Sequence, residues 1–171
     1  MILQDIINII ESVAPLSYQE SWDNSGLQVG DRNAEIHAAL LTVDVTESVV
    51  DEAIEKHCDL IISHHPLIFR GLKQITGSTT QERCIEKAIR HNIAIYSSHT
   101  SMDVYLHGVS GKIADKLDII NYHILCPTTD DNVGLGVIGE LKTPMKSDDF
   151  IHFVQNIFDC SLRYIKPCDE N

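Results

Sequence analysis

The sequence predicts an α/β fold with a mostly parallel or mixed sheet that is covered by helices on both faces. Strand-like and helix-like patterns alternate between residues 36 and 118, which is the order expected of successive βαβ units. The strand-like runs are short and almost uniformly apolar, as expected for strands buried on both faces of a sheet. After residue 118 the alternation weakens, and we expect the start of a second α/β module there.

A helix is expected at the amino terminus, because apolar residues recur at helical spacing up to Pro15, which ends the pattern. Its apolar face consists of Ile2, Leu3, Ile6, Ile7, Ile10, Val13 and Ala14. Polar residues interrupt the segment and it has no basic n-region, so it is not typical of a signal peptide. A polar loop is predicted over residues 17–31, "SYQESWDNSGLQVGD", which holds the only tryptophan of the chain.

The central elements alternate between strand and helix. The predicted strands cover residues 36–45, 59–63 and 93–98, and the helices that follow them cover residues 46–58, 81–92 and 108–118. Thr46 is a candidate N-cap for the first of these helices, and Glu47 lies near the positive end of its dipole. Thr79 and Glu82 have the spacing of a capping box ahead of the second helix.

The carboxy-terminal part has a weaker pattern. Strands are expected near Tyr122 and over residues 134–141, a helix capped by Ser147 is expected to run to about Cys160, and residues 161–166 are predicted as a last strand. We therefore divide the chain into an amino-terminal α/β domain that carries the site, residues 1–125, and a partial second module, residues 126–171.

Composition and charge exclude several classes of protein. The net charge of −12 argues against a nucleic-acid groove, which needs clustered Lys and Arg, although a bound metal could locally offset the charge of a phosphorylated substrate. No apolar run is long enough to span a membrane. The five cysteines are dispersed and form no CxxC pair, which is typical of free thiols in a reducing compartment. We expect a cytoplasmic protein that binds neither membranes nor nucleic acid.

Polar residues follow each of the three central strands. Asp44 lies at the end of the first, Ser63, His64 and His65 end the second, and Ser97, Ser98 and His99 end the third, with Asp103 shortly after. Ligands of open α/β sheets bind beyond the carboxyl ends of the strands, so these side chains are expected at one edge of the sheet. If the chain leaves the sheet after Ser63, strand alternation ends and both adjacent histidines can face one crevice. His64, His65, His99 and Asp103 are the ligand types of Zn²⁺, Fe²⁺ or Mn²⁺.

Other polar residues have simpler interpretations. Asp44 is either part of the crevice or a cap of the next helix. "GLGVIG" is expected to be a glycine-rich strand, because no lysine or capped helix follows it as in a phosphate loop. Cys58 and Cys84 are predicted to be structural thiols in helical segments. Structural or surface positions are expected for His37, His57, His91, His107, His123 and His152.

Three blocks of the sequence resemble a known family. These blocks are "SWDNSGLQVGD", "DVTESVVDEAIEKHCDLIISHHPLIFRGLKQIT" and "NIAIYSSHTSMDV". They resemble the signature blocks of the NGG-interacting-factor-like proteins, also called dinuclear metal centre proteins or GTP cyclohydrolase 1 type 2 homologues. The paired histidines followed by the HTxxD block make the resemblance specific, and it extends from about Leu3 to Leu162.

The resemblance implies that His64, His65 and Asp103 ligate a centre of two divalent metal ions, with zinc, iron or manganese as candidates. His99, the histidine of the HTxxD block, would stand beside the metals, and its imidazole is a candidate general acid or base. The implied activity is metal-dependent hydrolysis of the cyclohydrolase or amidohydrolase type on a small molecule, with nucleotides among the candidates. The alternative is a non-enzymatic metal-binding scaffold or regulatory protein. The resemblance also implies homo-oligomers, with a toroidal hexamer as the family's assembly.

Two further expectations come from matching this chain to the family. The loop of Trp22, Asp23 and Asn24 is expected to fold toward the crevice; the alternative is a surface loop anchored by one buried indole. The family completes its centre with a later HxxxE-like block, and the nearest candidate here is His152, followed by Asn156 where Glu is needed. We therefore expect the chain to be the front part of a longer protein and catalytically incomplete by itself; the alternative is a metal centre that is weak, mononuclear or completed by water.

Overall fold

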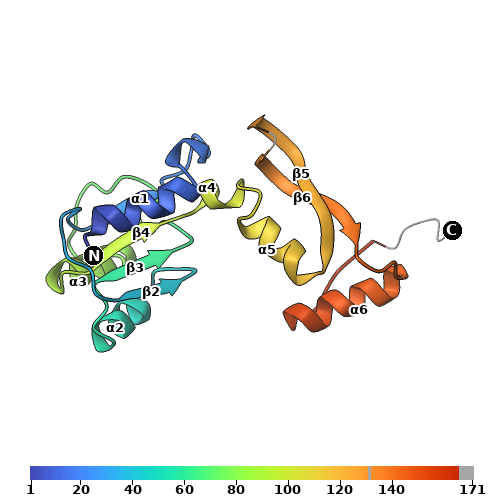
Figure 1. Ribbon diagram of the computed structural model, residues 1–171. Helices are drawn as coiled ribbons and strands as arrows, with labels where there is room; N and C mark the ends of the chain where they lie inside the picture. Colours follow the sequence, from blue (N-terminus) through green and yellow to red (C-terminus); the bar gives the residue numbers. More distant parts are fainter. Residues whose placement is uncertain (131, 166–171) are drawn as a thin grey trace. The chain divides into compact units, whose positions relative to one another are not determined.

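A computed structural model describes residues 1–130 and 132–165 (Figure 1). The chain forms two compact units, the first unit from Met1 to Tyr105 and the second unit from Leu106 to Asn171. The boundary expected after residue 125 falls inside a strand of the second unit. Within the described residues, no helix has both the length and the apolar character needed to cross a bilayer.

The first unit is built on one sheet with the strand order β1-β4-β3-β2. The strands are β1 (Gly26–Val29), β2 (Ala39–Thr42), β3 (Leu60–Ser63) and β4 (Ala94–Ser97). The pairs β2–β3 and β3–β4 are parallel, whereas β1 runs antiparallel to β4. The predicted mixed α/β fold is confirmed, but the expected polar loop contains β1 and a short 3₁₀ turn, η1 (Leu16–Tyr18).

Helices cover both faces of this sheet, as the apolar strands predict (Figure 1). On one face α1 (Leu3–Val13) packs through Leu3 and Ile7 against Leu60 and Tyr96. On the other face α2 (Glu47–Glu55) and α3 (Thr80–Arg90) pack on the neighbouring strand positions. That core includes Val50, Ala53, Ile61, Cys84, Ile85, Ala88 and Ile95.

The predicted helix caps of the first unit are confirmed. The Thr46 hydroxyl accepts a hydrogen bond from the amide of Val49 at the start of α2. The Thr79 hydroxyl accepts one from the amide of Glu82 at the start of α3. In turn, the Glu82 carboxylate accepts hydrogen bonds from the amides of Thr76 and Ser78, which lowers its pKa from the ordinary value. Cys84 is in α3, but Cys58 lies beyond the end of α2; both thiols are buried and free.

The second unit contains α5 (Val109–Lys116), an antiparallel hairpin of β5 (Ile119–Asp130) and β6 (Val133–Leu141), and α6 (Ser147–Phe158). Both predicted helices and the strands predicted near Tyr122 and over residues 134–141 are present, with α5 packed against β5. Lys146 and not Ser147 occupies the N-cap position of α6, and no side chain caps this helix. The last predicted strand is wrong for residues 161–165, which are irregular, and Lys166 lies outside the described residues.

Gly30 follows β1 at a place where the backbone comes very close to β4. Its φ is +122°, and a Cβ atom there would lie 2.7 Å from the Cβ atom of Ala94. We expect Gly30→Ala to lower the free energy of unfolding by ~1–3 kcal/mol, because it adds both a steric clash and backbone strain. Urea unfolding measures this change. Gly71→Ala is the matched control, since a Cβ atom at residue 71 would have no neighbouring atom within 4 Å; an equal loss in both variants would contradict the explanation.

Candidate metal centre

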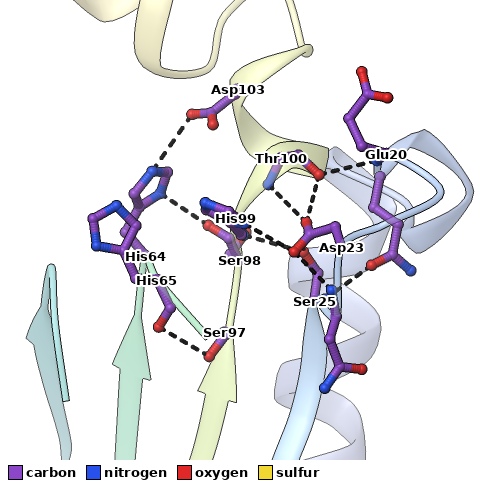
Figure 2. A network of polar contacts seen from close by, with 12 residues as sticks. Glu20, Asp23, Ser25, His64, His65, Ser97, Ser98, His99, Thr100 and Asp103 are labelled. Carbon is purple, nitrogen blue, oxygen red and sulfur yellow. Dashed lines mark hydrogen bonds and ion pairs between the residues drawn. The ribbon is translucent and has the colours of Figure 1, made fainter. Parts of the chain in front are cut away.

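The carboxyl ends of β2, β3 and β4 meet at one edge of the first unit's sheet, because these three strands are parallel. The chain bends away from the sheet at His64 and His65, directly after β3. Their amides still bond to the Thr42 and Val43 carbonyls, 3.1 Å and 2.9 Å away. The predicted departure from the sheet after Ser63 is therefore present, and it brings both imidazoles to the same side (Figure 2).

A buried pair of hydroxyls fixes this bend. Ser63 Oγ and Ser97 Oγ, from neighbouring strands, lie 2.8 Å apart. Ser63 Oγ donates to the His65 carbonyl at 2.8 Å. Ser97 Oγ lies 3.4 Å from the same oxygen (Figure 2). The two serines thus hold the backbone that presents the histidine pair.

His64, His65 and His99 form one cluster. The ring centroids are 4.9 Å apart for His64 and His65, 5.2 Å for His64 and His99, and 5.5 Å for His65 and His99. One nitrogen from each ring can be chosen so that all three atoms lie within 4.8 Å of one another, which is suitable for a metal ion. Asp103, at the end of the short helix α4 (Thr100–Asp103), lies with its Oδ1 3.6 Å from His64 Nε2.

In each of the three rings the Nδ1 atom has an acceptor. His64 Nδ1 donates to the Ser98 carbonyl at 3.2 Å, and His99 Nδ1 donates to Asp23 Oδ1 at 2.8 Å (Figure 2). His65 Nδ1 donates to Asp44 Oδ1 at 2.7 Å. Nε2 is then the nitrogen that each ring can offer to a metal. Metal-binding histidines ordinarily have this arrangement, in which a carboxylate or a carbonyl fixes the tautomer and the direction of the ring. Of its two interpretations, Asp44 therefore takes the crevice role, since Thr46 caps α2.

Asp23 reaches the site because β1 is antiparallel to β4. Gly26, the first residue of β1, pairs with Ser97, the last residue of β4, so the segment before β1 arrives at the edge that carries the histidines. The Asp23 side chain is fully buried there. Besides His99, it accepts hydrogen bonds from the Thr100 hydroxyl and amide, the Ser25 hydroxyl and the Asn24 amide.

Burial alone would raise the pKa of the Asp23 carboxyl, but the hydrogen bonds from Thr100, His99 and other donors outweigh it and hold this pKa well below its ordinary value. The carboxylate is therefore an acceptor for His99 Nδ1–H across the whole neutral range. The loop of Trp22, Asp23 and Asn24 thus folds toward the crevice, as expected. The alternative was a surface loop anchored by a buried indole, and it is wrong about the indole, because Trp22 is exposed.

The sequence predicts that His64, His65, His99 and Asp103 lie together, and the structure brings these four side chains to one place. Sequence reasoning missed the hydroxyl pair of Ser63 and Ser97, and Asp23 as the partner of His99. The position of the two serines could have been predicted from the sequence, because each ends a predicted strand and a histidine follows within two residues. For Asp23 the family block indicates only that its loop folds toward the crevice; the contact with His99 has no sequence signal, because it depends on the pairing of β1 with β4.

Comparison with known proteins agrees with this architecture. The chain is 45% identical over 128 residues to a GTP cyclohydrolase 1 type 2 homolog of Bacillus subtilis, covering 75% of this chain and 34% of that protein. A protein of the same name from Clostridium acetobutylicum is 38% identical over 165 residues, covering 95% of this chain and 62% of the relative. The chain thus spans less than two thirds of the length of these two curated relatives.

Solved structures are similar as well. Staphylococcus aureus protein SA1388 matches with a TM-score of 0.84 and 29% identity over 93% of this chain and 66% of its own. Reduced HcgD from Methanocaldococcus jannaschii matches with a TM-score of 0.76 and 28% identity over 91% of this chain and 60% of its own. A family model, described as Duf34/NIF3 (NGG1p interacting factor 3), matches residues 1–171. The chain therefore belongs to the Duf34/NIF3 family.

Proposed function

We propose that the first unit is the metal-binding part of a metal-dependent hydrolase that acts on a small molecule, with nucleotides as the first candidates. The observation that supports this most is the shared arrangement of His64, His65 and His99, in which each Nδ1 is held by an acceptor and each Nε2 is left for a metal ion or a proton. Hydrogen bonds are common to structural histidines as well, and it is the convergence of three ring nitrogens within 4.8 Å of one another that favours a metal site. The name of the relatives, GTP cyclohydrolase 1 type 2 homolog, also supports a hydrolase.

The donor set fits a divalent transition metal. Imidazole nitrogens with a carboxylate oxygen suit zinc, iron or manganese, and the His64 and Asp103 side chains are both partly open to solvent. In our proposal His64, His65 and Asp103 hold two such ions. Each ion ordinarily takes about four to six ligands, so water or other protein groups complete the coordination. Divalent ions at this place would supply Lewis-acid chemistry and make a water molecule more acidic.

His99 is assigned the proton-transfer role. Asp23 holds its Nδ1–H, so Nε2 is the atom that accepts a proton from the attacking water and returns it to the leaving group. The buried carboxylate also stabilises the imidazolium that exists between these two transfers. A general acid–base group of this kind contributes ~10²–10⁴-fold to the rate.

A turnover screen with a His99 variant tests the proposal. Because this chain is expected to be catalytically incomplete by itself, the screen uses a protein extended through the family's later HxxxE-like block. This protein is loaded with Zn²⁺, Mn²⁺ or Fe²⁺ and supplied with nucleotides and small amides, and hydrolysis is followed with and without a chelator. We expect metal-dependent turnover that falls ~10²–10⁴-fold in His99→Gln while bound metal stays the same. If His99→Gln loses metal as well as activity, His99 is a ligand. Metal binding without turnover of any compound would instead favour a non-enzymatic scaffold.

We also propose that the protein works as a homo-oligomer, with a hexamer as the expected size, and in the cytoplasm. The free thiols of Cys58 and Cys84 are compatible with a reducing compartment. Light scattering after gel filtration measures the mass in solution, and a monomer at all concentrations would contradict the oligomer.

A further inference from the structure

Two exposed aromatic rings stand beside the histidine cluster. Trp22 is 57% exposed and Phe69 is 45% exposed. Their ring centroids are 5.9 Å apart, with the ring planes inclined at 54°, and the Trp22 ring lies 6.2 Å from the His99 ring. Neighbouring aromatic rings left open to water beside a polar site are typical of ligand-binding surfaces, because burial is the ordinary position of such side chains.

The two loops that carry these rings are fastened to each other. Asn24 Nδ2 donates to the Ile68 carbonyl at 2.6 Å. The Gln28 side chain connects the same two residues, since its Nε2 donates to the Asn24 carbonyl at 2.7 Å and its Oε1 accepts from the Ile68 amide at 3.0 Å. Asn24 is two residues from Trp22 and Ile68 is directly before Phe69. A polar framework therefore fastens together the two loops that carry the rings.

The Trp22 loop is also fastened to the edge that carries the histidines. Asp23, the next residue, holds His99 and the first residue of α4, Thr100, through its buried carboxylate (Figure 2). The histidine cluster and the two aromatic rings are thus connected through one short segment, from Trp22 to Asn24. A surface prepared in this way binds a flat ligand without the cost of ordering two loops first.

From these contacts we propose that Trp22 and Phe69 form a ring-binding subsite, which stacks the flat heteroaromatic ring of the substrate next to the metal centre. This inference rests on the proposed function, because it makes the two rings specificity-determining residues of that same site. A flat ring fits better than an aliphatic chain, since aromatic faces stack on any base and both side chains are about half exposed to solvent. The contact between Trp22 and His99 keeps such a ring close to the proton-transfer group.

The single tryptophan makes the subsite directly measurable, because all indole emission comes from Trp22. The zinc-loaded protein is titrated with guanosine monophosphate and, separately, with ribose 5-phosphate, which has the same sugar phosphate and no ring. We expect saturable quenching with guanosine monophosphate and no change with ribose 5-phosphate. Phe69→Leu should weaken the affinity for guanosine monophosphate about tenfold, within the range for a lost base–aromatic stack, and Phe69→Tyr should retain it.

Two controls separate this inference from the proposed function. Ile9→Ala, which changes another exposed apolar residue, should leave the titration unchanged. Zinc affinity measured by calorimetry should be the same in Phe69→Leu and the wild type. Zinc binding with no effect of the ring compound overturns the subsite. Quenching by the ring compound without any zinc binding overturns the proposed function. Emission that changes with protein dilution, and not with the ring compound, also overturns the subsite and assigns the two rings to a contact between copies.

Discussion

Replacing both His64 and His65 with alanine is expected to abolish zinc binding by this chain while leaving the first unit folded. The two rings supply two of the converging nitrogens, so their loss should weaken zinc binding by much more than the ~10–100-fold usual for a lost outer hydrogen-bonding partner. Folding should persist, because Ser63 and Ser97 hold the backbone at this bend without using either imidazole. Elemental analysis of the purified protein measures the metal content directly.

Thermal unfolding gives a second measurement of the same variant. A ligand that binds only the folded state stabilises it, so zinc should raise the Tm of the wild type and have no effect on the double variant. His37→Ala combined with His91→Ala is the matched control, because it removes two exposed histidines that lie outside the cluster. Undiminished zinc in the His64 and His65 variant would show that the site lies elsewhere.

Asp23→Asn should have the second-largest effect, although Asp23 would not touch the metal. The substitution keeps the shape of the side chain but removes the charge that orients His99 Nδ1–H. Loss of such an outer partner ordinarily costs ~10–100-fold in metal affinity or activity, and we expect a loss in this range. Calorimetric titration of zinc and the turnover assay report the two quantities separately.

Two other substitutions show whether the effect comes from Asp23's charge. Asp44→Asn removes the corresponding acceptor of His65, but the Asp44 side chain is 64% exposed, so water can replace it and a smaller effect is expected. Asp23→Ala should also destabilise the fold, because it leaves buried donors of Ser25 and Thr100 without their partner, at ~1–3 kcal/mol for each donor left unsatisfied. An Asp23→Asn protein with wild-type zinc affinity and turnover would contradict the role of Asp23.

The edge where the site lies could be predicted from the sequence because one physical rule decides it. Parallel strands place their carboxyl ends together, so the polar residues after β2, β3 and β4 had to meet. The caps Thr46 and Thr79 were predictable for a similar reason, since they depend only on residues within one helical turn.

The parts that sequence reasoning missed depend on contacts between distant segments. The four residues of β1, "GLQV", are too few to show a strand period and lie in a polar stretch, so their antiparallel pairing had no local signal. The same holds for Phe69, whose position beside Trp22 depends on bonds between Ile68 and two residues about 40 positions away in the chain. The N-cap of α6 was misplaced by one residue, which is the ordinary uncertainty of a helix end.

The antiparallel β1 strand also determines when the site can exist during folding. His99 and its acceptor Asp23 are 76 positions apart, and Thr100 is 77 positions from the same carboxylate. Closing such a long loop is entropically costly, and contacts of this sequence separation form slowly. During synthesis on a ribosome, the Asp23 carboxylate therefore lacks its partners His99 and Thr100 until β4 and α4 have emerged. The contact that orients His99 therefore forms late in folding. A chain that has not yet folded its whole first unit cannot hold the complete site.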